Sequence, residues 1–163
     1  MTSLSRNGLL GLGLAGLTLV LGGCNKSEAA ETRAVTGKTE KAEALTARAE
    51  TENYVVYLRP AGEHKKDAEG FVEVVLETKG DFHINEQYPY KFTPKESEGV
   101  KFSKEKFGRD DGTFDKSKAV LKVAFTPSKS GPVSVGGKFS LSVCSDKNCL
   151  MDKKDLALDV TVK

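Results

Sequence analysis

The chain has 163 residues, and its 25 Lys and Arg residues nearly balance its 23 Asp and Glu residues. The lysines are spread along the chain rather than gathered with aromatic residues, so the composition argues against a nucleic-acid-binding protein. The sequence has no Ser-His-Asp order, phosphate-binding loop or paired-carboxylate signature, which argues against a hydrolase.

Residues 1–23 are typical of an export signal. The opening segment carries one cation, Arg6, and residues 8–21 form an uncharged stretch rich in Leu and Gly. That stretch has the length of a signal-peptide core and is too short for a transmembrane helix, which needs about 20 apolar residues. Residues 21–24 read Leu-Gly-Gly-Cys, which resembles the lipobox cleaved by lipoprotein signal peptidase.

Cys24 is the expected lipidation site and the mature N-terminus. With acyl chains such as palmitate attached to Cys24, the protein is predicted to be a membrane-anchored envelope lipoprotein that faces the periplasm or the cell surface. In enteric bacteria an Asp after the lipidated Cys acts as an inner-membrane retention signal. This chain has Asn25 at that position, so the outer membrane is favoured. An ordinary membrane anchor with an incidental cysteine is the alternative, and it keeps the same membrane attachment.

Residues 24–52 are predicted to form a flexible tether. After the cysteine this segment has no aromatic residue, and Val35 and Leu45 are its only large aliphatic residues. So little apolar surface cannot build a core. The charges around residues 38–51 fall on every side of a helix, so no amphipathic stripe is present. Fully extended, the tether reaches roughly 90 Å.

The remaining residues, 53–163, number about 110 and suit one domain. Apolar and polar residues alternate with a period of two, which is typical of half-buried strands. The clearest runs are 70–78, 121–125, 139–143 and 156–162, and further candidates are 54–59, 82–84, 90–93 and 100–102. Seven or eight short strands without a helical stripe predict an all-β sandwich.

The cysteines carry the chemical signal in this domain. With Cys24 taken by the lipid, Cys144 and Cys149 remain as an even pair in an exported protein, which predicts a disulfide. The four residues between them, Ser-Asp-Lys-Asn, favour a turn. Strict alternation along the preceding strand places Cys144 on the outer face with Ser140 and Ser142, where another thiol can reach it, whereas a bulge would turn it inward. The pair is either exchange-active or a static cross-link.

Around these cysteines the chain resembles the immunoglobulin-like N-terminal domain of the thiol:disulfide interchange protein DsbD and its stand-alone relatives. Residues 137–144 read Gly-Lys-Phe-Ser-Leu-Ser-Val-Cys, Ser-Asp follows, and Cys149 leads through Leu into a final strand. This matches the family's order of strand, Cys, small residue, Asp and Cys. The similarity in position extends upstream to 82–85, 92–94 and 121–125. The resemblance covers about residues 70–163 and implies an immunoglobulin-like β-sandwich.

In that family the cysteine pair passes electrons from a membrane partner to periplasmic thiol proteins. The resemblance implies that Cys149 faces the partner and that Cys144 resolves the mixed disulfide. No cofactor is expected. A loop with an aromatic residue shields the pair in the family, and Phe107-Gly108 is the nearest match. Relatives usually carry Pro after the second Cys, whereas this chain has Leu-Met-Asp at 150–152. The membrane segments and thioredoxin-like domain of DsbD have no counterpart here, so a redox role requires separate thioredoxin-fold or other periplasmic thiol partners.

The two histidines are weak candidates for metal binding, and both are expected at the surface or half-buried. His64 lies in a charged loop and His83 in a short β-like run. A copper or zinc site built from His83, Cys144 and Cys149 is the alternative, because thiolate and imidazole are suitable ligands, but no close Cys/His spacing points to it and no metal is expected. The sequence leaves open two function classes, a thiol:disulfide oxidoreductase and a non-catalytic lipoprotein whose β-sandwich binds a partner. It does not indicate an oligomeric state.

Overall fold

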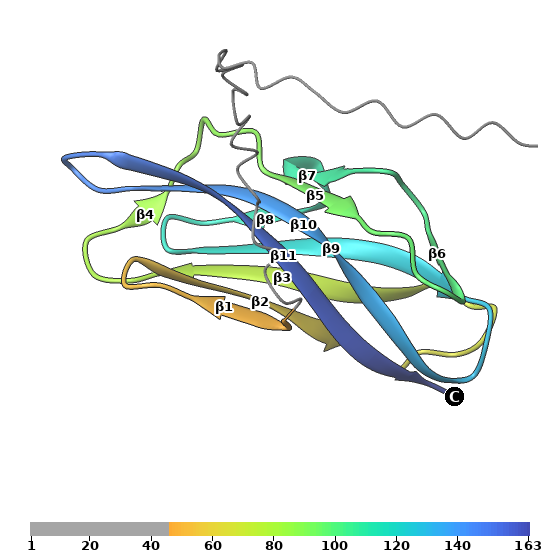
Figure 1. The fold of residues 1–163 in the computed structure, drawn as a ribbon. Helices are drawn as coiled ribbons and strands as arrows, with labels where there is room; N and C mark the ends of the chain where they lie inside the picture. The colour runs from red at the N-terminus through yellow and green to blue at the C-terminus, as the bar shows by residue number, and fades with distance from the viewer. Residues whose placement is uncertain (1–45) are drawn as a thin grey trace, which may run out of the picture. The chain divides into compact units, whose positions relative to one another are not determined.

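A computed structural model describes residues 46–163, which form two antiparallel β-sheets packed face to face (Figure 1). The predicted fold class, an all-β immunoglobulin-like sandwich, is confirmed. The predicted signal peptide, Cys24 and most of the predicted tether lie outside the described residues.

The first sheet has six strands in the order β1-β2-β3-β9-β6, and β8 also pairs with β9. The strands are β1 (Arg48–Glu50), β2 (Tyr54–Ala61), β3 (Gly70–Thr78), β6 (Val100–Phe102), β8 (Gly112–Phe114) and β9 (Lys118–Pro127). The central strands β3 and β9 are rich in Val, which fits a pleated surface buried against a second layer.

The second sheet has five strands in the order β11-β10-β5-β7, and β4 also pairs with β10. The strands are β4 (His83–Ile84), β5 (Lys91–Pro94), β7 (Phe107–Gly108), β10 (Gly131–Cys144) and β11 (Cys149–Val162). A short 3-10 helix, η1 (Arg109–Asp111), lies between β7 and β8.

The core lies between the sheets and is built from the inward-facing residues of both. Its largest fully buried side chains include four phenylalanines, Phe92, Phe107, Phe125 and Phe139. Close packing explains the glycine at position 137, where a Cβ atom would lie 2.4 Å from the Thr93 carbonyl oxygen and 2.6 Å from Phe92 Cζ. A larger residue there would push β5 away from β10.

The described residues contain eleven strands, more than the seven or eight predicted. The weak candidates near residues 82–84, 90–93 and 100–102 are strands β4, β5 and β6. The sequence missed β1, β7 and β8, which have only two or three residues each. So few residues cannot display a period of two.

The folded domain begins before Asn53, which corrects the predicted boundary between tether and domain. Strand β1 lies inside the predicted tether and pairs in register with β2. Next to it, the Ala47 carbonyl accepts a hydrogen bond from the Leu58 N–H at 2.8 Å, and the Thr46 carbonyl accepts one from the Ala157 N–H at 3.0 Å. Main-chain hydrogen bonds hold this segment on the sheet edges. The prediction from the sequence missed it because composition reports on side chains and not on main-chain hydrogen bonds.

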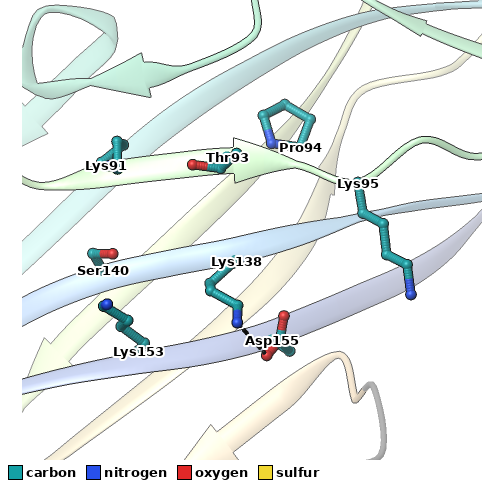
Figure 2. A pocket seen from close by; sticks show the side chains of 8 residues that line it. All are labelled: Lys91, Thr93, Pro94, Lys95, Lys138, Ser140, Lys153 and Asp155. Carbon is teal, nitrogen blue, oxygen red and sulfur yellow. Dashed lines mark ion pairs between the residues drawn. The ribbon is translucent and has the colours of Figure 1, made fainter. Parts of the chain in front are cut away.

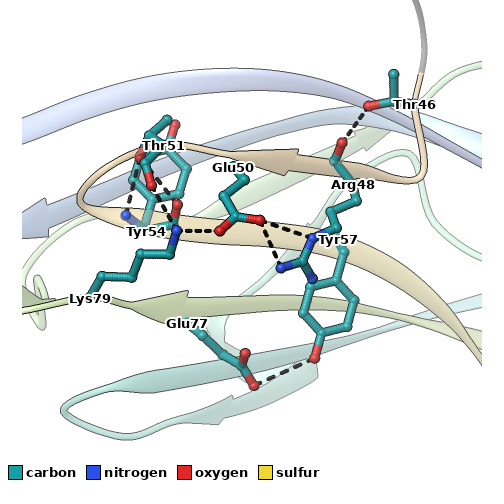
Figure 3. Close-up of polar contacts among 8 residues, drawn as sticks. All are labelled: Thr46, Arg48, Glu50, Thr51, Tyr54, Tyr57, Glu77 and Lys79. Carbon is teal, nitrogen blue, oxygen red and sulfur yellow. Dashed lines mark hydrogen bonds and ion pairs between the residues drawn. The ribbon is translucent and has the colours of Figure 1, made fainter.

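Charged side chains fasten the turn between β1 and β2 (Figure 3). Glu50 forms ion pairs with Lys79 and with Arg48, the latter at 2.9 Å, and Lys79 Nζ also donates to the Thr51 carbonyl at 2.9 Å. The Arg48 guanidinium lies 5.4 Å from the centre of the Tyr57 ring. Because these groups are largely exposed, each ion pair contributes little, and the main-chain pairing provides most of the attachment.

His64 is buried, with 3 % exposure, whereas the sequence predicted a surface or half-buried position. The loop between β2 and β3 folds back on the end of β11, where the Lys163 N–H donates to the His64 carbonyl at 2.9 Å. The imidazole lies 5.1 Å from the Phe125 ring, and neither ring nitrogen has a hydrogen-bond partner among residues 46–163. Burial lowers the pKa of His64, which favours a neutral ring that packs as part of the core.

Removing β1 is expected to destabilise the domain. A fragment that begins at Asn53 loses the main-chain pairs of β1, so its free energy of unfolding should be about 1–3 kcal/mol lower than that of a fragment beginning at Thr46, because each backbone hydrogen bond contributes about 1 kcal/mol. Urea unfolding followed by circular dichroism measures the difference. Equal midpoints for the two fragments would show that β1 adds nothing to stability.

Candidate thiol–disulfide site

Cys144 and Cys149 form a disulfide at the turn of the β10–β11 hairpin, as predicted. They are the last residue of β10 and the first of β11, and their Cα atoms are register partners 4.0 Å apart. In the turn between them the Ser145 N–H donates to the Asn148 carbonyl at 2.8 Å. The register is continuous along both 14-residue strands, so no bulge turns Cys144 inward.

The two cysteines differ in exposure. Cys149 is exposed, whereas Cys144 is buried with 6 % exposure. Alternation places Cys144 on the outer face with Ser140 and Ser142, but all three are buried, so the predicted accessibility of Cys144 is wrong. At Cys144, strand β10 has β4 on one side and β11 on the other. Because the Cys144 side chain is small, these neighbouring strands leave little of it exposed. A thiol arriving from solvent therefore meets Cys149 first.

His83 lies beside the disulfide. It is the Cα partner of Cys144 across β4 and β10, and Cys149 is the partner on the other side. Directly opposite residues project from the same face with Cβ atoms about 4.5–5.5 Å apart, so the three residues form one row across three strands. The row contains all the ligands of the alternative metal site, but its two sulfurs are bonded to each other. Residues 46–163 contain no group of three His, Cys, Asp or Glu side chains placed to hold a metal ion.

Tyr90 fastens the strand that ends in Cys144. Between the segments where β4 and β5 pair with β10, the buried Tyr90 hydroxyl donates to the Ser142 carbonyl and accepts a hydrogen bond from the Asn85 N–H at 3.0 Å. Asn85 Nδ2 also donates to Ser142 Oγ at 3.2 Å. Burial raises the pKa of Tyr90 to about 12, so the hydroxyl keeps its proton at physiological pH.

Asp152 fastens the start of β11 to the opposite sheet. The Tyr54 hydroxyl donates to Asp152 Oδ2 at 2.5 Å, and the Lys154 ammonium lies 3.2 Å from the same oxygen. Asp152 Oδ1 accepts a hydrogen bond from the Lys153 N–H at 2.7 Å. Burial acts to raise the pKa of Asp152, but the hydrogen bonds from Tyr54, Lys153 and Lys154 outweigh it and lower the pKa. The hydrogen bond from Tyr54 holds the inner side of β11, the strand that carries Cys149, against the six-stranded sheet.

Phe107 and Gly108 do not shield the disulfide, which corrects that assignment. They form β7, where Phe107 is the Cα partner of Phe92 and is 1 % exposed in the core. Strand β5 separates β7 from β10. An aromatic residue followed by Gly occurs both in surface loops and in short edge strands, so this dipeptide alone could not show which of the two Phe107-Gly108 forms. Phe82 is an aromatic residue that does lie near the hairpin turn, where it lines a hollow together with residues 145–147.

The predicted membrane attachment involves residues outside the described part of the chain. Among residues 46–163, no helix is long and apolar enough to cross a membrane. Lipidation of Cys24 stays a prediction.

Replacing Tyr90 with Phe is expected to loosen the strand beside the disulfide. The loss of the hydroxyl weakens the polar contacts of the Ser142 carbonyl and the Asn85 N–H, and should lower the free energy of unfolding by about 1–3 kcal/mol. Because the pKa of Tyr90 is raised in the folded state from 10.0 to about 12, its protonated form adds stability that is full below pH 10 and is lost as the pH rises toward 12. Chemical unfolding across this window should show a steeper alkaline decline for the parent than for Tyr90→Phe. Parallel curves would contradict the burial of this hydroxyl.

Comparisons with known proteins add little to this description. No family model matches the chain, and no curated protein matches it either. Among solved structures, the chain is similar to the ASH / PapD-like domain of human CEP192 (PapD-like domain 7), with 9 % sequence identity, a TM-score of 0.28, and coverage of 72 % of this chain and 92 % of that chain. None of these comparisons bears on the resemblance to the DsbD domain, which stays a prediction.

Proposed function

We propose that this chain is a lipid-anchored protein of the bacterial envelope whose β-sandwich domain exchanges disulfides with periplasmic thiol proteins through Cys144 and Cys149. The observation that carries the exchange function is the unequal exposure of the two cysteines, 6 % for Cys144 against an exposed Cys149. An exchange site needs one sulfur open to attack, whereas a static cross-link does not. The resemblance to the DsbD domain around the same two cysteines supports the proposal.

Exchange begins when a partner thiolate attacks the sulfur of Cys149. A bond forms between the partner and Cys149, the bond between Cys149 and Cys144 breaks, and Cys144 leaves as a thiolate. A second thiolate of the partner then attacks the partner's own bridging sulfur and releases Cys149 as a thiolate. The partner leaves as a disulfide, and this chain has gained two electrons and, from water, two protons. In the opposite direction the reduced pair gives its electrons to an oxidised partner.

His83 favours this order of attack. Burial disfavours the charged form of Cys144, so the thiolate needs a stabilising neighbour as it leaves. His83 lies directly opposite Cys144 on the same face, where an imidazole N–H can stabilise the thiolate as other hydrogen-bond donors and cations do. A donor at this position would offset the cost of burying the Cys144 thiolate, and the exposure of Cys149 makes it the point of attack.

The anchor proposal rests on the sequence before the folded domain. The Leu-Gly-Gly-Cys ending at residues 21–24 follows an uncharged apolar stretch of signal-peptide length. An anchored chain would remain in the envelope, the compartment in which disulfides form and thiol proteins exchange them.

A static cross-link is the competing function, in a lipoprotein whose β-sandwich binds a partner without redox chemistry. The disulfide joins directly opposite residues of a continuous ladder and closes a hairpin that main-chain hydrogen bonds already form. Such a bond would resist reduction until the fold melts, and its reduction potential would lie below about −300 mV.

Trapping each cysteine separately tests the exchange function. The full chain carrying Cys24→Ser and Cys144→Ser is mixed with a thioredoxin-fold protein that has one cysteine, activated as its thionitrobenzoate disulfide. Cys149 should displace thionitrobenzoate and form the mixed disulfide, and absorbance follows the release. The matched variant, Cys24→Ser with Cys149→Ser, leaves only the buried Cys144 and should react at least about tenfold more slowly, because reactivity requires access.

Equal rates for the two variants would contradict the assigned order of attack. If Cys149 forms no mixed disulfide, and the parent disulfide resists glutathione buffers until the fold melts, the static cross-link is the correct function.

Lipid attachment has its own test. Replacing Cys24 with Ser should move the processed protein from the membrane fraction to the soluble periplasmic fraction, or leave it unprocessed, because the acylated sulfur is lost. Cell fractionation with immunoblotting measures the shift, and a surface Cys149→Ser variant serves as the control that stays with membranes. A Cys24→Ser protein that is cleaved after Gly23 and still fractionates with membranes would refute anchoring through Cys24.

A further inference from the structure

Lysines line the outer face of the five-stranded sheet in two rows. Lys91, Ser140 and Lys153 are Cα partners across β5, β10 and β11, and Thr93, Lys138 and Asp155 form the next row. Figure 2 shows these six side chains around one surface hollow, together with Pro94 and Lys95. Neighbouring strands lie about 4.8 Å apart, so the Cα atoms of Lys91 and Lys153 are roughly 10 Å apart on either side of β10.

This lysine face has a clear excess of positive charge. The hollow is lined by four lysines and a single carboxylate, Asp155. Asp155 pairs with Lys138 at 3.5 Å (Figure 2), and no carboxylate among residues 46–163 pairs with Lys91, Lys95 or Lys153. All four lysines are exposed. Lys91, Lys95 and Lys153 therefore repel one another with solvent as their only screen, and an anionic surface placed here would be attracted to all three.

Cys149 lies on the same face as these lysines. Along β11, Cys149, Met151 and Lys153 alternate with Leu150 and Asp152, so the first three project to the same side. At about 3.4 Å per residue, the Cα atom of Lys153 is roughly 14 Å from that of Cys149. Exposed side chains of β11 therefore lead from Cys149 to the lysines.

Met151 adds an exposed apolar residue between them. It is 74 % exposed, and the other large hydrophobic residue exposed among residues 46–163, Phe71, lies on the six-stranded sheet. A flexible, polarizable Met is suited to contacts with partners of differing shape. A sulfur open to attack, an apolar contact and a basic surface thus follow one another along one strand.

We propose that this outer face is a docking surface for an acidic protein segment that carries the cysteine reacting with Cys149. The proposal rests on the exchange function and names the kind of partner it serves. The lysines attract the segment and raise the rate of encounter, and Met151 packs against its apolar part. The partner's cysteine is then brought beside Cys149.

Three cysteine peptides of equal length test the docking surface. Their single cysteine is flanked by Glu, by Lys or by Ser, and each reacts with the disulfide of the full chain carrying Cys24→Ser. At low salt the Glu peptide should react about tenfold faster than the Lys peptide, the lower end of what electrostatic steering achieves. The difference should vanish near 1 M salt, where the Debye length is about 3 Å.

Charge reversal on the two faces of the sandwich provides the matched comparison. Lys91→Glu combined with Lys153→Glu should abolish or reverse the preference for the Glu peptide. Lys101→Glu combined with Lys122→Glu changes the net charge equally, but on exposed positions of β6 and β9 in the other sheet, and should keep the preference. Equal rates for all three peptides, or equal effects of the two double variants, would overturn the docking surface and leave the exchange function standing.

A peptide without a thiol separates docking from exchange. The Glu peptide with its cysteine replaced by Ser should shift the backbone amide NMR signals of Lys91 and Lys153, and the Lys peptide should not. If the disulfide fails to react with any thiol while these shifts appear, the exchange function fails and docking of acidic segments stands. Absence of the shifts, or binding of this face to anionic lipid vesicles without preference among the peptides, would overturn the proposed protein partner.

Discussion

The antiparallel ladder between β10 and β11 is the constraint on which the rest of the structure depends. It pairs Gly131–Cys144 with Cys149–Val162, residue by residue and without a bulge. Because side chains alternate across a strand, a slip by one residue would turn every core residue of the hairpin to the solvent face. The same register that buries Leu141 and Leu156 therefore also sets which residues surround the disulfide.

Strand position explains the difference between the two cysteines. Cys144 ends an interior strand with neighbours on both sides, and Cys149 begins a strand at the sheet edge. Farther along β11, Thr46 and His64 form bridges to Leu156 and Val162 and cover part of that edge. Covered edges limit unwanted pairing with other chains. The proposed exchange site lies at the end of β11 away from these bridges.

Both sheets contribute to the surroundings of the disulfide. Tyr90, next to β5, holds the main chain at Ser142, while Tyr54 of the six-stranded sheet holds Asp152. These contacts lie on the inner side of the hairpin, whereas the lysine face and Met151 lie on its outer side. The period of two thus separates the residues that position the hairpin from those of the proposed docking surface, so that the outer residues can change without altering the core.

Local patterns in the sequence were enough to predict β3 and parts of β9, β10 and β11, the faces of those parts, and the pairing of Cys144 with Cys149. These features depend on alternation and on short spacing, which neighbours along the chain determine. The burial of Cys144, the core position of Phe107, the burial of His64 and the pairing of β1 with β2 were all missed. Each of them depends on which distant segments lie side by side, and that is decided only when the two sheets close around a common core.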